Sequence, residues 1–137
     1  MQTIVLGYDG SEPAKRALER TVQLAKAFSA SVIVTSIAPI FVGVGHGIGG
    51  IDPVDPPEEH RAQLAEATKL LAEAGVHADV RLLVGVPPEA IVHVAKEASA
   101  DLIVVGTREL GFFERILHGS VSDGVEHRAH CDVLIVH

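Results

Sequence analysis

The 137-residue sequence lacks the features that mark several classes of protein. It has one cysteine, Cys131, so no disulfide can form within the chain, and we expect a reducing compartment. No apolar run approaches the roughly 20 residues that a membrane-spanning helix needs, because Gly7 and Asp9 interrupt the first run. No basic stretch of the kind that opens a signal peptide stands at the beginning of the sequence. We therefore expect a cytoplasmic protein with no membrane partner.

Basic residues are also scarce. Eleven Lys and Arg stand against eighteen Asp and Glu, which gives a formal net charge of −7, and the basic residues are spread along the chain. Non-specific binding to nucleic acid depends on clustered cations, so we expect no nucleic-acid partner. A compact anionic ligand is still compatible with this charge, because a few local donors are enough to bind it.

The residues that are abundant predict an α/β fold. Aromatic residues make up only 4% of the chain, but 47% is hydrophobic and mostly aliphatic, which is typical of a core between a sheet and helices. Short apolar runs, rich in Val and Ile, alternate with segments of helical periodicity. The runs predict strands at 3–9, 31–37, 76–84, 101–106 and 132–137. The periodic segments predict helices after Ser11, at 57–74, after Pro87-Pro88 and at about 119–130.

Five strands that alternate with four helices predict one α/β domain over residues 1–137. The expected architecture is a doubly wound, Rossmann-like parallel sheet with strand order 3-2-1-4-5 and helices on both faces. Ser11 is expected to cap the first helix, and Gly75 to end the second. Polar residues alternate with the apolar ones in 76–84, which favours a place near a sheet edge. Residues 39–56 form the one long irregular segment.

This topology predicts where a ligand would bind. In a doubly wound sheet the ligand site lies beyond the carboxyl ends of the strands, at the point where the strand order reverses. Here that point lies between the first and fourth strands. The loop after the first strand reads "YDGSE", and the fourth strand leads through Gly106 toward Gly119-Ser120 at an expected helix start. Free N–H groups at a helix start favour an anion, although the same residues also suit an ordinary strand end and helix start.

The sequence resembles the universal stress protein family along its whole length. The spacing Gly106-x2-Glu109-x9-Gly119-Ser120 is similar to the family's ATP-binding motif, G-x2-G-x9-G-[S/T]. "TIVLGYDGSEPAKRAL" resembles the family's first strand and helix, and "GVPPEAIVHVAKEASADLIVVGTR" its third helix and fourth strand. "ILHGSVSDGV" and "CDVLIV" resemble its ending.

The resemblance implies an adenine nucleotide, ATP or another, in the crevice. Gly7 and Asp9 would then line the ribose and adenine, Ser36 would stand where the family has an adenine-contacting Val, and an Mg²⁺ ion could accompany the phosphates. Glu109 replaces the second glycine of the motif, which puts phosphate binding in doubt. The remaining expected contacts are Val105 and Gly106 through their backbone, and Gly119, Ser120, Val121 and Ser122 at the phosphates.

The predicted function is a binding or sensing module of the stress response. The sequence has no Walker lysine and no acidic pair for Mg²⁺ beyond Asp9, so we expect no catalytic residues and at most slow ATP hydrolysis. His127, His130 and Cys131 have no evident fourth ligand, so no metal site is expected. Two alternatives stay open: a protein that binds AMP or a cyclic nucleotide, and an interaction protein that binds no nucleotide. The apolar strand 132–137 predicts, together with the resemblance, a homodimer through this strand.

Overall fold

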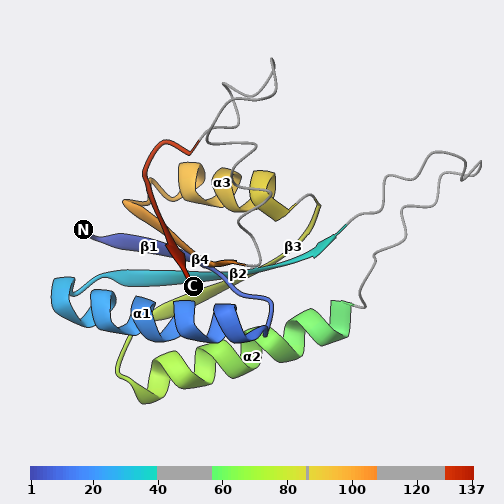
Figure 1. Cartoon of the computed structure of the whole chain (residues 1–137), viewed down its shortest axis with the longest axis horizontal. Coiled ribbons are helices and arrows are strands. Elements are labelled where there is room, and N and C mark those ends of the chain that lie inside the picture. The colour runs from blue at the N-terminus through green and yellow to red at the C-terminus, as the bar shows by residue number, and fades with distance from the viewer. Residues whose placement is uncertain (40–56, 86, 108–128) are drawn as a thin grey trace, which may run out of the picture.

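The computed structural model describes residues 1–39, 57–85, 87–107 and 129–137 and contains one five-stranded parallel sheet (Figure 1). The strand order is β3-β2-β1-β4-β5, which confirms the predicted order and the doubly wound topology. Along the chain the elements are β1 (Thr3–Gly7), α1 (Glu12–Phe28), β2 (Ser31–Pro39), α2 (Pro57–Glu73), β3 (Ala78–Gly85), α3 (Pro87–Glu97), β4 (Leu102–Gly106) and β5 (Asp132–Val136).

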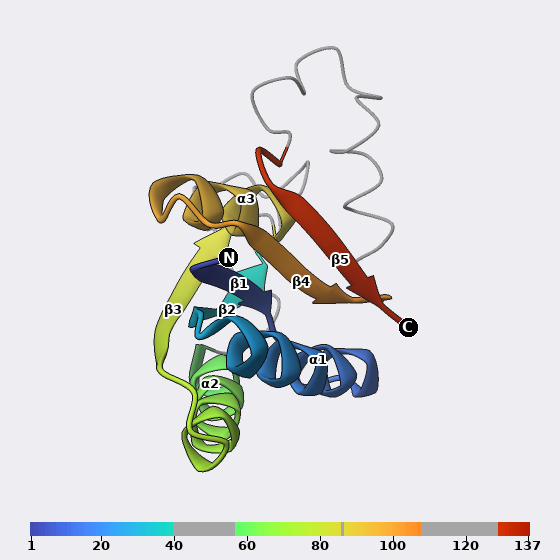
Figure 2. The same ribbon diagram turned by 90° about the vertical axis from the view of Figure 1, so that its left-hand side faces the viewer.

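The helices lie on both faces of the sheet, as predicted. In Figures 1 and 2, α1 and α2 lie side by side on one face and α3 covers the other. Alternate strand residues therefore enter two separate cores. Ile4 and Leu6 of β1 pack toward α1 and α2, whereas Val5 packs toward α3. Most of the helix expected at 119–130 lies outside the described residues, and its last two positions, 129 and 130, are not helical.

The local signals that begin and end the helices agree with the sequence interpretation. The side chain of Ser11 caps α1 by accepting a hydrogen bond from the backbone N–H of Ala14, and Pro13 occupies the first turn, where a missing N–H costs nothing. Beyond the end of α2, Gly75 has φ of +79°, the left-handed conformation that a residue without Cβ adopts most easily. Both Ser11 and Gly75 therefore act as predicted.

The central position of β1 brings two loops together. Thr3 of β1 is paired with Ser31 of β2, and on the other side Leu6 is paired with Val104 of β4. Because these pairings are parallel, β1 and β4 end at the same side of the sheet. The loop that begins at Tyr8 and the loop that follows Gly106 therefore start beside each other. This is the point of reversal at which the sequence analysis placed a ligand.

Candidate functional site

The described residues include half of the predicted site. Gly7, Asp9, Ser36, Val105 and Gly106 are placed. Four of them lie at or just beyond the carboxyl ends of β1 and β4, and Ser36 lies in the second half of β2. The expected phosphate contacts at Glu109, Gly119, Ser120, Val121 and Ser122 lie outside the described residues. The described part of the predicted site is therefore the end that was assigned to the base and the ribose.

Gly7 and Val105 lie against each other on the α3 side of the sheet. A Cβ atom on Gly7 would lie 2.9 Å from Cδ1 of Ile91 and 3.0 Å from Cγ1 of Val105. The Val105 side chain is fully buried in the core beneath α3. Only backbone groups of Val105 are left for a ligand, which is the kind of contact that the resemblance implies.

Gly106 is in close contact with the beginning of α1. A Cβ atom here would lie 2.6 Å from the carbonyl carbon of Pro13, 2.7 Å from Pro13 Cβ and 2.8 Å from the backbone nitrogen of Ala14. Two of these three atoms are backbone, so the first turn of α1 would have to move to accept any side chain. From the sequence, this glycine suited either the close approach of a ligand or an ordinary strand end. The structure adds a second reason, since α1 itself occupies the space.

Asp9 shapes the loop between β1 and α1. Its Oδ1 atom accepts hydrogen bonds from both the backbone N–H and the hydroxyl of Ser11, and the N–H distance is 2.9 Å. Gly10, between them, has φ of +77°. The half-buried Asp9 therefore holds a tight turn and orients the residue that caps α1. A carboxylate fixed in this way lies directly beyond β1, beside the point where the strand order reverses.

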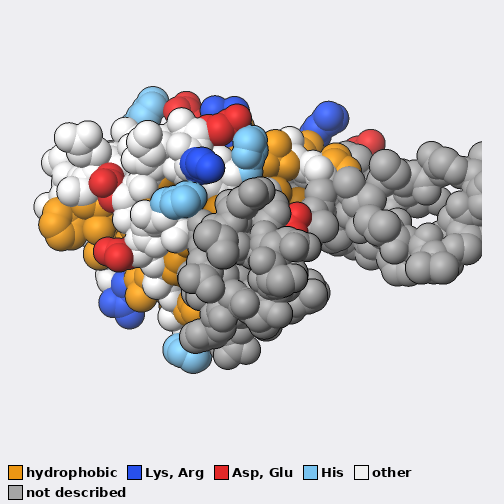
Figure 3. All heavy atoms as spheres, turned by 90° about the horizontal axis from the view of Figure 1, so that it is seen from above, with side chains coloured by type: hydrophobic (Ala, Val, Ile, Leu, Met, Phe, Trp, Pro, Cys, Tyr) orange, Lys and Arg blue, Asp and Glu red, His pale blue; other side chains and the backbone are white. Residues whose placement is uncertain are grey.

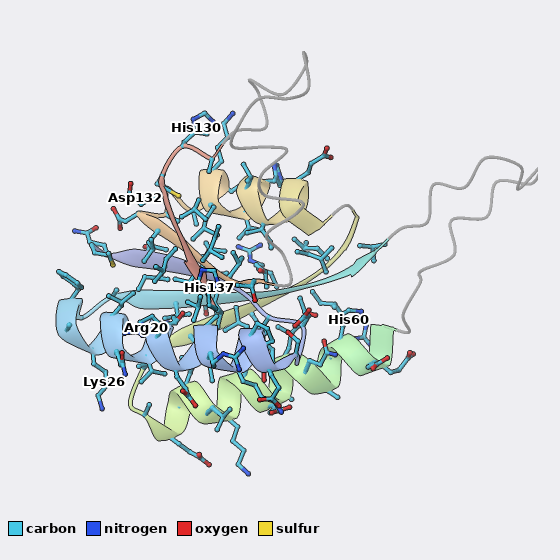
Figure 4. All side chains as sticks on the ribbon, viewed as in Figure 1. Arg20, Lys26, His60, His130, Asp132 and His137 are labelled. Carbon is cyan, nitrogen blue, oxygen red and sulfur yellow. The ribbon has the colours of Figure 1, made fainter. Side chains whose placement is uncertain are left out.

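Ser36 lies on the opposite side of the sheet from Gly7 and Val105. It is 1% exposed, and its hydroxyl shares a 2.7 Å hydrogen bond with Nδ1 of His60, which is itself buried in the first turn of α2. Figure 4 shows His60 at the start of α2, beneath the sheet. The next residue of β2, Ile37, is buried in the same core as Val105. Ile37, like Ile33 of the same strand, therefore lies on the Gly7 and Val105 side, and Ser36 does not.

His60 is one of three polar side chains of α2 that face the ends of the neighbouring strands. We call these three residues, His60, Gln63 and Glu66, the α2 seam. These three residues are spaced three apart and so lie along one side of the helix. Glu66 accepts a 3.4 Å hydrogen bond from the hydroxyl of Tyr8, and Gln63 lies over Gly10. The seam thus touches Tyr8, just beyond β1, and Ser36 within β2. Sequence analysis missed it, and the only signal was a polar His60 on the apolar side of the helix.

Tyr8, just beyond β1, is buried. Its ring is 3% exposed, and burial, reinforced by the negative charge of Glu66, raises the pKa of the phenol from 10.0 to about 12. Burial disfavours the charged phenolate, and a nearby carboxylate disfavours it further. Tyr8 is therefore neutral at physiological pH and donates its hydroxyl hydrogen to Glu66.

The rest of the described surface contributes little to the predicted site. A groove of about 840 Å³ between α2 and β3 is lined by none of the predicted site residues. On the face in Figure 3, Lys and Arg side chains are interspersed with acidic ones among the described residues. Within the described ranges, no group of three or more His, Cys, Asp or Glu could hold a metal ion, and no helix has the length and apolar character to cross a membrane.

Comparison with known proteins agrees with this geometry. The model of the universal stress protein family matches residues 1–137. The universal stress protein MJ0531 of Methanocaldococcus jannaschii is 38% identical over an alignment of 137 positions, which covers 97% of this chain and 80% of that protein.

Two solved structures extend the comparison. The first, a universal stress protein in complex with cAMP, is 34% identical with a TM-score of 0.69, over 99% of this chain and 97% of that one. The second, a universal stress protein from Archaeoglobus fulgidus in complex with dAMP, is 26% identical with a TM-score of 0.71, over 100% and 98%. The fold and these matches lead to one conclusion: the chain belongs to the universal stress protein family.

Proposed function

We propose that the protein binds an adenine nucleotide in the crevice beyond β1 and β4 and acts as a binding or sensing module in a stress response. The observation that carries the proposal is the parallel pairing of β1 with β4, which brings the Asp9 loop beside the start of the loop that contains the Gly119-Ser120 motif. Anions and nucleotides bind at such points of reversal. Two relatives that match nearly the whole chain have been solved with cAMP and with dAMP.

The described residues suggest how the base and ribose are held. Asp9 is fixed by Ser11 just beyond β1, where its carboxylate can accept hydrogen bonds from ribose hydroxyls. Ile37 provides an apolar side chain at the end of β2, so we assign it the packing role that the resemblance gave to Ser36. Ser36 is held by His60 and would act on the ligand only through α2.

A nucleotide with a single phosphate is the preferred ligand in this proposal. Glu109 replaces the second glycine of the motif, and the relative at 34% identity was solved with cAMP. At about 6 Å from one phosphate charge and an effective dielectric near 20, a carboxylate repels that charge by roughly 2–3 kcal/mol. Salt reduces this repulsion to about 1 kcal/mol, or about fivefold in affinity. The repulsion grows with the number of phosphates, so AMP and cAMP are expected to bind more tightly than ATP in the absence of Mg²⁺.

Two measurements test the proposal. Native mass spectrometry of freshly purified protein should detect a bound adenine nucleotide. Calorimetry should then show binding that is lost in Gly119→Val, because a side chain there blocks close approach of the backbone to the phosphate. If AMP, cAMP, ADP and ATP all fail to bind the wild type, the proposal fails, and the alternative of an interaction protein takes its place.

The variant Glu109→Gly tests the preference among nucleotides. It should tighten ATP several-fold, AMP less, and adenosine hardly at all. A Mg²⁺ ion bridging Glu109 and the phosphates would reverse this order, and the variant would then weaken ATP binding only when Mg²⁺ is present. Equal affinities of the two proteins for every ligand would show that Glu109 does not face the phosphates.

A further inference from the structure

The α2 seam contains a residue, Gln63, that lies against the Asp9 loop at Gly10. At Gly10, a Cβ atom would lie 3.3 Å from both Cγ and Nε2 of Gln63 and 3.4 Å from its Cδ. The glutamine side chain therefore lies flat over the backbone of Gly10. Gly10 is also the residue with a left-handed backbone, between Asp9 and the capping Ser11. Any change in the path of the loop at Gly10 would move Asp9.

Within the described residues, no hydrogen bond to the amide oxygen of Gln63 holds its side chain in place. Its Oε1 atom is buried and has no hydrogen-bond partner in the described part of the chain. A buried acceptor without a partner destabilises the folded state. We therefore attribute the position of the Gln63 side chain over Gly10 to van der Waals contact, which depends on the length and shape of that side chain. An apolar residue of equal length would make the same contact without the unpaired oxygen.

The hydrogen bonds from Tyr8 to Glu66 and between Ser36 and His60 do not involve Gly10. Glu66 binds the hydroxyl of Tyr8, whose backbone N–H is already fixed by the carbonyl of Thr35. His60 Nδ1 shares a hydrogen bond with Ser36 in β2. Gln63 is therefore the member of the seam that lies against the turn itself.

We propose that Gln63 is a positioning residue of the nucleotide site: by its contact with Gly10 it holds the β1–α1 loop in the conformation that presents Asp9 to the ribose. The proposal rests on the proposed nucleotide-binding function, and it adds α2 to the elements that determine affinity. It also predicts a difference in affinity between ligands, because Asp9 can accept hydrogen bonds only from ligands that carry ribose hydroxyls. AMP should depend on Gln63, and 2′,3′-dideoxy-AMP should not.

Three variants separate the contact from general stability. Gln63→Ala removes all three atoms that lie over Gly10, Gln63→Met keeps the length but not the amide, and Gln23→Ala is a matched change at an exposed position of α1. Calorimetry with Gln63→Ala should give AMP binding at least fivefold weaker than wild type and dideoxy-AMP binding within twofold. Gln63→Met and Gln23→Ala should both bind AMP within twofold of wild type. Gln63→Met should also unfold at a higher temperature, since the unpaired oxygen is gone.

Hydrogen exchange adds a readout that needs no ligand. The backbone N–H groups of Gly10 and Ser11 should exchange faster in Gln63→Ala than in wild type, while those of β1 keep their protection. Unchanged exchange at these two positions would overturn the proposal. So would equal weakening of AMP and dideoxy-AMP, or a Gln63→Met protein that behaves like Gln63→Ala. A wild type that binds no AMP removes the nucleotide function instead, and the exchange data then still decide whether Gln63 holds the loop.

Discussion

Replacing Gly106 with alanine tests whether β4 and α1 are in direct backbone contact. The new methyl group would lie 2.6 Å from the carbonyl carbon of Pro13 and 2.8 Å from the nitrogen of Ala14. Neither atom can rotate away as the end of a flexible side chain can. The first turn of α1 must therefore shift, and with it the cap at Ser11, which is hydrogen-bonded to Asp9.

The cost follows from the geometry. Inserting a methyl group into a packed interior costs about 1–3 kcal/mol, and we expect about 3 kcal/mol here because the contacted atoms belong to the backbone. For a domain of this size, that corresponds to a melting temperature lower by about 10 °C. Gly75→Ala is the matched control. Nothing lies within 4 Å of its Cβ position, so it should cost only the roughly 1–2 kcal/mol of a left-handed backbone.

Urea unfolding of the three proteins, followed by circular dichroism, measures both costs. Gly106→Ala should lower the midpoint more than Gly75→Ala, with an unchanged dependence on denaturant. Its AMP affinity should also fall, because the shift of α1 moves Asp9. If Gly106→Ala unfolds within about 0.5 kcal/mol of wild type while Gly75→Ala shows its full cost, the contact between β4 and α1 is not as close as the structure has it.

Three further predictions concern titration and assembly. Tyr8 is the only tyrosine, so its ionisation can be followed by ultraviolet absorbance. The midpoint should be about 12 in the native protein and 10.0 in urea. The stabilisation that comes from the neutral phenol should be complete below pH 10 and disappear as the pH rises toward 12. A native midpoint near 10 would contradict its burial. Hydrogen bonds from the backbone N–H groups of Gln2 and Thr3 lower the pKa of Asp101, so its contribution to stability should be present above pH 3.8 and be lost as the pH falls through the lowered pKa. Asp101→Asn should remove this loss, and a stability curve parallel to that of wild type would contradict it. Finally, β5 lies at a sheet edge, and we expect a homodimer through it that Leu134→Pro converts to monomer or insoluble protein; light scattering that finds a wild-type monomer at micromolar concentration would refute this.

The elements and their order could be predicted because their signals are local. Short aliphatic runs, a capping serine and a terminating glycine each reflect the geometry of a few neighbouring residues. The boundaries shifted only slightly: α3 begins at Pro87 itself, since proline is tolerated in a first turn. The strand order was expected from the doubly wound topology, without any pairing visible in the sequence, and the structure confirms it.

The details of the site were harder, because they depend on how distant elements meet. Neighbouring residues of a strand point to opposite faces, so Ser36 and Ile37 lie on opposite sides of the sheet, and our proposal moves the packing role to Ile37. The bond between Ser36 and His60 depends on how α2 lies on the sheet, and no spacing in the sequence reveals it. The same holds for Gln63 and Gly10. Only the turn at Asp9, formed by residues two apart, could be foreseen.

The central position of β1 also has a consequence during synthesis. Its partner β2 follows closely in the chain, but its other partner, β4, begins only at Leu102. At roughly 5–20 residues per second, a ribosome needs on the order of 3–13 s to proceed from the end of β2 to β4. During that interval one aliphatic edge of β1 is without its partner strand and is open to pairing with another nascent chain. The strand beside which the proposed ligand loops begin is thus also one that the growing polypeptide leaves half paired, and a chaperone that covers this edge would prevent aggregation there.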